Sequence, residues 1–262
     1  MSRARILVIG CCLFMLPCLM AAKPTSRQFK DAETVELFSA IKSGELEVKF
    51  IPKDTAQANV IVKNLTKKPL RIQMPAAFAG LPVLAQDDFG GGGGDFGGGN
   101  QNNQQGQQAL GGGMGGGMMG GGMMGGGMGG MFNVAPERVH KIKVKTVCLE
   151  HGKKDPNPRV PYELHPIKAF TSNAHVHELC AMLGRGEIDQ VAAQAAAWHL
   201  TDDLSYQDLA RKIKVKHLNG SVEMYFNPKQ LQIASRIVQA VKVRVEKSAS
   251  QEKSPGEVPE TL

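Results

Sequence analysis

The amino-acid sequence predicts an α+β protein. A small Ig-like β-sandwich is interrupted by a disordered Gly/Met-rich insert and followed by a helical subdomain. Three observations support this prediction. Apolar and polar residues alternate in short segments up to residue 86 and again from residue 139, a glycine-rich tract separates these two groups, and helical patterns dominate after Cys148. Strands that come first and helices that follow them are typical of α+β architecture.

The first 22 residues have the form of a secretory signal peptide. Two arginines precede an uncharged apolar run from Ile6 to Met20, and a pair of alanines ends at Ala22. The run is shorter than the roughly 20 residues that a membrane-spanning helix needs. We therefore expect cleavage near Ala22, export to the periplasm, cell surface or extracellular space, and no transmembrane segment in the mature chain. A lipid anchor at Cys11, in "VIGC", is the alternative.

Residues 23–86 are expected to hold an N-terminal helix and the first strands of the sandwich. The helix is predicted over residues 31–43, where apolar side chains recur on one face and Gly44 follows as a stop signal. Alternation in "ELEVKFIP" predicts a half-buried strand. The segments "ANVIVKN" and "PLRIQM" predict two more strands, and "GLPVLAQ" predicts a weaker fourth.

Residues 87–130 form a low-complexity insert that includes "FGGGGGDFGGGNQNNQQGQQ" and "GGGMGGGMMGGGMMGGGMGG". Such a chain buries too little apolar surface to offset its ordering entropy, so we expect it to be disordered. Because strands are predicted on both sides, the insert is interpreted as a distended loop of one domain. Methionine thioethers suit Cu(I), but flexible glycine favours a spacer or an oxidation sink.

Residues 131–247 are expected to supply the last sandwich strand, the helical subdomain, a hairpin and a C-terminal helix, and residues 248–262 a disordered tail. The strand is predicted to end at Cys148, after three alternating lysines. Asn219-Gly220 predicts a hairpin turn, and Asn227-Pro228 predicts the start of the last helix. The helices and hairpin are expected over residues 174–183, 190–200, 206–212, 213–226 and 228–245.

Composition and motifs limit the function classes. The formal net charge is +7, and its alternating lysines indicate either a solvated face or a basic patch for an anionic surface polymer. Aromatic residues make up 5% of the chain, which is too few to favour nucleic acid through base stacking. The sequence contains no P-loop, dinucleotide fingerprint, "HExxH" or "GxSxG" motif. We therefore predict no cofactor, and favour a non-enzymatic binding or structural protein whose partner is a surface polymer or a protein.

One polar side chain is expected inside the predicted helix 190–200. Val191, Gln194 and Trp198 share one helical face. Trp198 is the chain's only tryptophan, and we expect it to be buried together with Gln194. A buried carboxamide needs hydrogen-bonding partners, and neighbouring backbone is the simplest source of them.

The segment Gln194–Trp198 resembles the "TQxAIW" segment of bacterial surface thioester domains, with Ala193 and Ala197 in place of the threonine and isoleucine. In those domains a cysteine on an earlier strand attacks the glutamine amide, ammonia leaves, and the internal thioester acylates amines on a target surface. Here "VCLEHGK" would supply Cys148. The resemblance implies a Cys148–Gln194 thioester and a surface adhesin as the alternative function. The layout of leader, glycine-rich insert and this module also resembles that of exported bacterial proteins.

Three other interpretations compete for the same sulfur. After removal of the leader the chain keeps only Cys148 and Cys180, which suggests one disulfide in an exported protein. Two free, buried thiols are the second interpretation. The third is a zinc site formed by Cys148, His151, His177 and Cys180, because Cys-x-x-His and His-x-x-Cys have ligand-like spacing. His175 could join that site only if the helix starts after it.

Overall fold

The computed structural model describes residues 29, 32–83, 106–113 and 130–252. The predicted signal peptide and residues 253–262 of the predicted tail lie outside this part of the chain. Within it the protein is α+β, as predicted, and residues 248–252 continue the C-terminal helix instead of belonging to a disordered tail.

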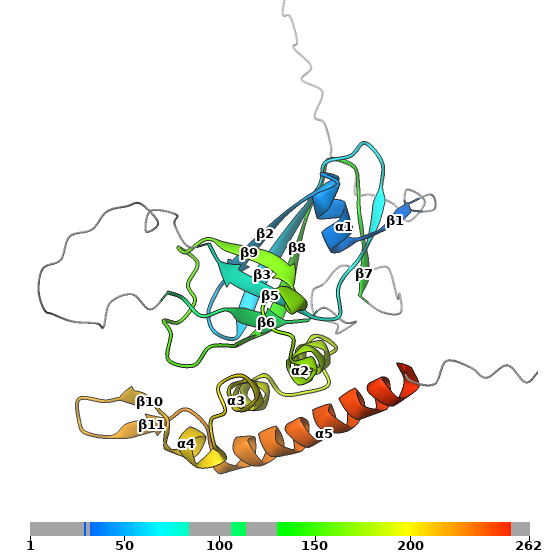
Figure 1. The fold of residues 1–262 in the computed structure, drawn as a ribbon. Coiled ribbons are helices and arrows are strands. Elements are labelled where there is room, and N and C mark those ends of the chain that lie inside the picture. The colour runs from blue at the N-terminus through cyan, green and yellow to red at the C-terminus, as the bar shows by residue number, and fades with distance from the viewer. Residues whose placement is uncertain (1–28, 30–31, 84–105, 114–129, 253–262) are drawn as a thin grey trace, which may run out of the picture.

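The main sheet is a closed six-stranded barrel with the strand order β2-β3-β8-β6-β5-β9 (Figure 1). Its strands are β2 (Leu46–Pro52), β3 (Gln57–Asn64), β5 (Phe78–Pro82), β6 (Leu110–Gly112), β8 (Val139–Cys148) and β9 (Tyr162–Pro166). The closure is a single pairing of Phe50 with Tyr162. The predicted sandwich is thus replaced by a barrel. The reason is that the sheet is closed with the help of two strands that were not predicted: β6 lies in the segment expected to be disordered, and β9 in a segment to which no helix or strand was assigned.

A second sheet lies beside the barrel. It consists of β1 (Glu33–Glu36), β4 (Leu70–Gln73) and β7 (Met131–Val134), with β1 parallel to β4 and β7 antiparallel to it. Helix α1 (Leu37–Lys42) follows β1 directly. The prediction of one helix from residue 31 is therefore wrong at its start, because residues 33–36 pair with β4 and the side chain of Glu36 caps α1 by accepting a hydrogen bond from Ser39 N at 2.7 Å.

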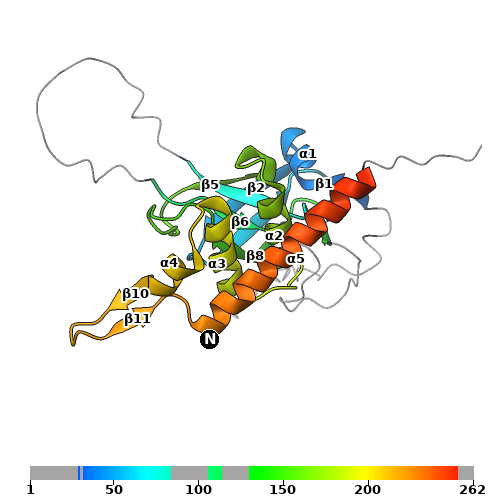
Figure 2. The ribbon, with the colours of Figure 1, turned by 60° about the horizontal axis from the view of Figure 1, so that its bottom comes forward.

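The predicted helices are present and form a layer against one side of the barrel (Figures 1 and 2). The helices of this layer are α2 (Ala174–Gly184), α3 (Gln190–Thr201), α4 (Tyr206–Arg211) and α5 (Pro228–Glu252). A short 3₁₀ helix, η3 (Ile167–Ala169), precedes α2. Helices α2 and α3 contact β8, and α5 packs across both. Buried side chains of the barrel and of the helices belong to one continuous hydrophobic core.

Strand β6 lies inside the segment predicted to be disordered, so that prediction is wrong for residues 106–113. Glycine is required there by close packing. A Cβ on Gly111 would lie 2.7 Å from Cys180 Sγ, and one on Gly112 would lie 2.6 Å from a ring carbon of Phe78. The glycines of β6 thus allow helix α2 and strand β5 to approach, which offsets their backbone entropy. Residues 87–105 and 114–129 of the predicted insert lie outside the described residues, and its last residue, Gly130, is described.

The predicted hairpin is confirmed. Strands β10 (Ile213–Lys216) and β11 (Val222–Met224) are antiparallel, and Gly220 in the turn has a φ of +84°. The hairpin projects away from the barrel and the helical layer in both ribbon views (Figures 1 and 2).

Candidate functional site

Helix α3 brings Gln194 to the end of strand β8. The side chain of Asp189 caps the helix by accepting a hydrogen bond from Ala192 N at 3.0 Å. Behind this cap, alanines fill the buried face, together with Gln194 and Trp198. Because alanine side chains are short, the helix axis lies close to the strand and a glutamine can reach its main chain.

The carboxamide of Gln194 bonds to both polar groups of the Cys148 main chain. Cys148 N donates to Gln194 Oε1 at 2.8 Å, and Gln194 Nε2 donates to Cys148 O at 2.9 Å. One turn earlier, Gln190 Nε2 donates to Thr146 O at 2.9 Å. Four residues of helix rise about 6 Å, and two residues of strand about 6.8 Å, so the two periodicities match here.

These glutamines replace a missing strand. The last pairing between β3 and β8 joins Gln57 to Lys145, and Ala56 O still accepts a bond from Thr146 N at 2.9 Å. Beyond this point β3 no longer flanks β8, although the other edge of β8 pairs with β6. Gln194 thus occupies the place of a neighbouring peptide group and satisfies Cys148 as a strand would.

The Cys148 thiol lies in a low-dielectric environment. Cys148 is fully buried, and the loss of solvent raises the pKa of its thiol far above the ordinary value. The carboxylates of Asp155 and Asp54 raise this pKa further. Cys148 Sγ lies 4.0 Å from Thr55 O, at the limit of a weak hydrogen bond. The thiol is therefore protonated at neutral pH and is not an activated nucleophile in this state.

Cys180 lies on the other face of the sheet. Cys148 pairs with Leu110, whereas the next residue, Gly111, faces Cys180 Sγ. Successive strand residues point to opposite faces, so the two thiols are separated by the β6–β8 ladder. Both are free and buried in the structure, and burial raises the pKa of Cys180 to about 12. The structure does not bring the predicted disulfide partners together.

The four predicted zinc ligands are also apart. His177 Nε2 lies 2.7 Å from Thr171 O, and His151 Nε2 lies 2.8 Å from Lys212 Nζ. His175, at the start of α2, has its Nδ1 3.2 Å from its capping residue. Across residues 32–83, 106–113 and 130–252, no group of three or more His, Cys, Asp and Glu residues is arranged to hold a metal ion.

An aromatic cluster around Lys212 adjoins the Gln194 segment. The ammonium of Lys212 lies 4.9 Å from the ring centroid of Trp198 and 5.6 Å from that of Tyr225. Burial lowers the pKa of Lys212, and burial together with Lys212 lowers the pKa of His151. The sequence indicated the burial of Trp198 but not this cluster, because Lys212 and Tyr225 come from the base of the hairpin and no local pattern links them to α3.

The outer face of the barrel carries a group of lysines that we call the lysine face: Lys49, Lys63, Lys141, Lys143 and Lys145. All are exposed and point away from the barrel interior on β2, β3 and β8. Glu47 forms ion pairs with Lys49 at 3.2 Å and Lys63 at 3.8 Å. The three lysines of β8 form no salt bridge with any described residue.

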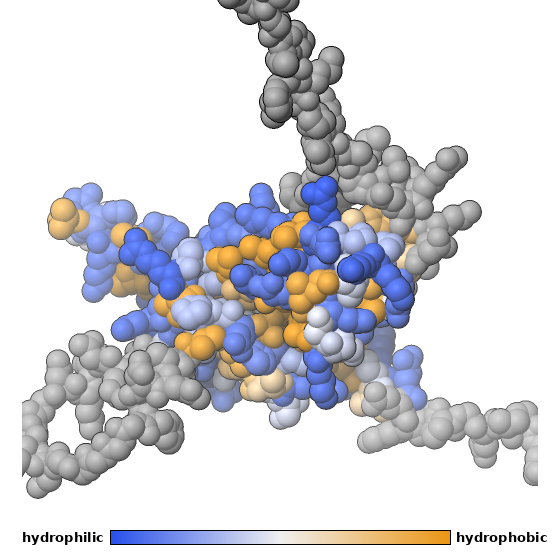
Figure 3. Space-filling model, turned by 90° about the horizontal axis from the view of Figure 1, so that it is seen from above, coloured by the Kyte–Doolittle hydropathy of each residue, from blue (hydrophilic) through white to orange (hydrophobic). Residues whose placement is uncertain are grey.

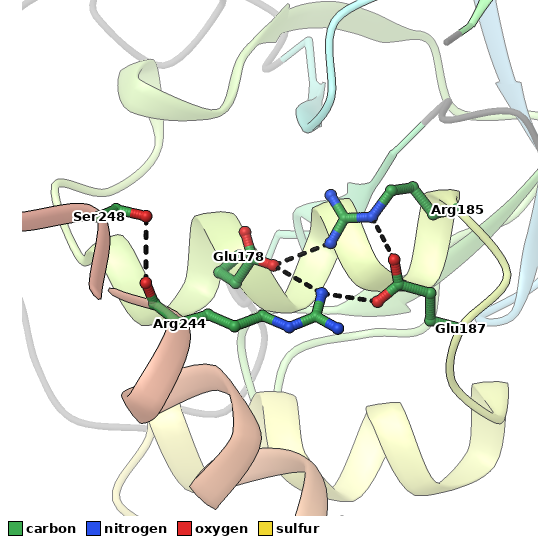
Figure 4. Close-up of polar contacts among 5 residues, drawn as sticks. All are labelled: Glu178, Arg185, Glu187, Arg244 and Ser248. Atoms are coloured by element: carbon green, nitrogen blue, oxygen red, sulfur yellow. Dashed lines mark hydrogen bonds and ion pairs between the residues drawn. The ribbon is translucent and has the colours of Figure 1, made fainter. Parts of the chain in front are cut away.

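A different charged cluster joins α2 to α5 (Figure 4). Arg244 Nη1 lies 2.6 Å from a Glu187 oxygen and 3.2 Å from a Glu178 oxygen, and Arg185 contacts the same two carboxylates. The hydrogen bond from Arg185 is the main cause of the lowered pKa of Glu187. Two cations face two anions, so this cluster is a neutral clamp between helices and not an ion-binding site.

In comparisons with known proteins, no family model matches the chain, and neither a curated protein nor a solved structure does. Among the described residues, no helix combines the length and apolarity that crossing a membrane requires. Function is therefore inferred from the geometry above.

Proposed function

We propose that the protein is an exported, non-enzymatic binding or structural protein of the cell envelope or extracellular space, and that the lysine face binds an anionic surface polymer. The observation that carries this proposal is the row of Lys141, Lys143 and Lys145 on one strand, which forms no salt bridge within the part of the chain that the structure describes. Alternate strand residues lie about 6.8 Å apart, so their ammonium groups form a regular cationic row. Such a row suits a linear chain of repeating negative charges.

The Cys148–Gln194 contact supports the non-enzymatic part of this proposal. The carboxamide is already engaged in completing the β8 ladder, and the thiol is protonated. Both features have a structural explanation that requires no reaction. The lysine face also lacks aromatic side chains, which favours a polysaccharide over single-stranded nucleic acid.

The binding test uses purified mature protein and polygalacturonate as the anionic polysaccharide. We expect binding that weakens as salt rises, and a loss of about tenfold or more on Lys141→Glu/Lys143→Glu/Lys145→Glu, since each exposed cation contributes on the order of 1 kcal/mol near a dense anionic surface. The matched control reverses three exposed lysines on α5: Lys229, Lys242 and Lys247.

Three results would contradict the proposal: absence of polysaccharide binding by the wild type, equal losses in the two triple variants, or tighter binding of single-stranded DNA. Circular dichroism of each variant checks that the barrel is intact.

The alternative function is a thioester-containing surface adhesin. The observation that favours it is the direct contact of Gln194 with the main chain of Cys148, across a sequence separation of 46 residues. In the proposed step, Cys148 Sγ attacks Gln194 Cδ and the thiol loses its proton. The Cδ–Nε2 bond breaks, and the amide nitrogen leaves as ammonia with that proton. The resulting thioester would acylate an amine and regenerate the thiol.

The intact mass of the mature protein distinguishes these states. A thioester lacks the mass of one ammonia and gains methylamine, whereas a disulfide lacks two hydrogens and does not react with methylamine. Gln194→Ala should abolish any methylamine adduct, and Cys180→Ala should not. An unmodified mass, with both thiols labelled by maleimide after unfolding, excludes the thioester and the disulfide. The same mass locates the N-terminus and so tests cleavage near Ala22.

A further inference from the structure

The β10–β11 hairpin exposes an unusual amount of apolar surface. Every residue from 213 to 224 is exposed. Half of the ten large hydrophobic side chains exposed on the described chain lie in this hairpin: Ile213, Val215, Leu218, Val222 and Met224. An isolated two-stranded hairpin is marginally stable in water, and clustered exposed apolar side chains mark interaction sites. The hairpin therefore has the features of a docking element without its partner.

Its charges indicate the chemistry of that partner. Arg211, Lys214 and Lys216 are exposed on or beside the hairpin. Its single carboxylate, Glu223, is 2.8 Å from Lys214 Nζ, and this bond lowers the pKa of Glu223. The excess of positive charge is complementary to an anionic surface.

The lysines of the hairpin favour a lipid surface over a protein partner. Residues 213–224 contain aliphatic side chains and lysines but no Phe, Tyr or Trp. Protein–protein interfaces are enriched in aromatic residues and depleted of lysine. Membrane-surface elements combine apolar side chains with lysines, whose long stems keep the ammonium at the headgroups.

The arrangement along the hairpin fits insertion from its tip. Leu218, in the turn, has a relative exposure of 110%. Directly behind it, Lys216 pairs with Val222. Orange hydrophobic side chains occur among blue hydrophilic ones on the hairpin, which projects at the left of Figure 3. An apolar tip with cations behind it would place Leu218 below the headgroups and Lys216 among them.

We propose that the β10–β11 hairpin docks the protein onto an anionic membrane surface, with Leu218 at the inserted tip. This inference does not depend on the lysine face or on the state of Cys148. It adds a second binding surface, of different chemistry, on the connection between α4 and α5, which projects away from the barrel.

The experiment is flotation of the mature protein with vesicles of phosphatidylglycerol and phosphatidylcholine, compared with pure phosphatidylcholine. We expect binding only to the anionic vesicles, and a decrease of about tenfold or more for both Leu218→Asp and Lys216→Glu. The matched controls are Leu65→Asp, at another exposed leucine, and Lys242→Glu, at an exposed lysine of α5. Both controls should float with the vesicles as the wild type does.

Four outcomes overturn the proposal. The first is that the wild type binds neither kind of vesicle, which would point to a protein partner, and the second is that it binds both equally. The third is unchanged binding by Leu218→Asp, and the fourth is an equal loss in Lys242→Glu. Because Leu218 and Lys216 are exposed, unfolding is not the expected effect of these changes, and circular dichroism of each variant verifies this.

Discussion

Replacing Gln194 by leucine removes both hydrogen bonds to the Cys148 main chain. The two side chains are similar in size, so the variant mainly leaves Cys148 N–H and C=O buried without partners. Each unsatisfied buried group costs about 1–3 kcal/mol, so Gln194→Leu should lower the free energy of unfolding by roughly 2–6 kcal/mol. That is a large part of the about 5–15 kcal/mol by which domains are stable.

Gln194→Glu makes the reasoning sharper because it depends on pH. A protonated carboxyl can accept from Cys148 N–H and donate to Cys148 O, as the amide does. An ionised carboxylate at this position would be desolvated and would face the carbonyl oxygen of Cys148. The pKa of the introduced glutamate in the folded state is therefore raised above its unfolded value of about 4.3. The stabilising contribution of the introduced glutamate is then fully present below its unfolded pKa and is lost as the pH rises through its folded pKa. The difference in stability from the wild type should therefore be small near pH 4 and large at pH 7.

Urea denaturation followed by far-UV circular dichroism, at several pH values, measures both effects. Gln190→Leu, which removes one bond at the half-buried start of α3, should cost about 1 kcal/mol. Gln239→Leu, on the exposed side of α5, should change stability by less than about 0.5 kcal/mol. A loss below about 1 kcal/mol in Gln194→Leu, or a deficit in Gln194→Glu that is the same at pH 4 and pH 7, would refute the role of Gln194 as a strand substitute.

Trp198→Ala should cost about 3–5 kcal/mol in urea denaturation because the ring is 2% exposed, and water-exposed indole fluorescence in the folded wild type would contradict this. Gly111→Ala should destabilise by about 1–3 kcal/mol through the contact with Cys180 Sγ, and adding Cys180→Ala should recover part of the loss; strict additivity would exclude that contact. Arg244→Ala should lower stability by less than about 1 kcal/mol, since its side chain is 44% exposed, and a larger loss would show that the clamp is buried in solution. Deleting residues 87–130, and β6 with them, should abolish the cooperative thermal transition, whereas an unchanged melting temperature would show that β6 is dispensable.

Hydrophobic alternation predicted strands of the barrel and one strand of the second sheet. Strands β2, β3, β4 and β8 fall on the segments expected from their sequences, as do the hairpin and all four helices after Cys148. Strands β6 and β9 were missed for physical reasons. Glycine carries no side-chain periodicity, so β6 had no signal, and β9 follows a proline-rich loop and is only five residues long. Without those two strands the sheet could not be recognised as closed.

The candidate site was predictable only where one helix face was enough. The spacing of Gln194 and Trp198 on α3 predicted that both are buried, and the structure confirms it. The contact with Cys148 was expected as one of two possibilities, a thioester or a local hydrogen bond, and the hydrogen bonds are present. Lys212 and Tyr225 were not predictable, because their meeting with Trp198 depends on how the hairpin base folds back on α3.

The glycines of β6 and the alanines of α3 have the same structural role, because both allow a helix to lie close to the barrel. At residues 146–148, strand β8 is flanked by β6 on one edge and by the glutamines of α3 on the other. Helix α2 can approach β6 because Gly111 has no Cβ, and Gly184 of α2 lies directly against Gly113. Helix α3 can approach β8 because its buried face is mostly alanine. Small residues therefore bring both helices close to the end of the barrel, and this closeness lets a glutamine side chain reach a strand and complete it. It follows that enlarging Ala197, three residues after Gln194 and on the same face of α3, should weaken the Gln194–Cys148 bonds without changing either residue.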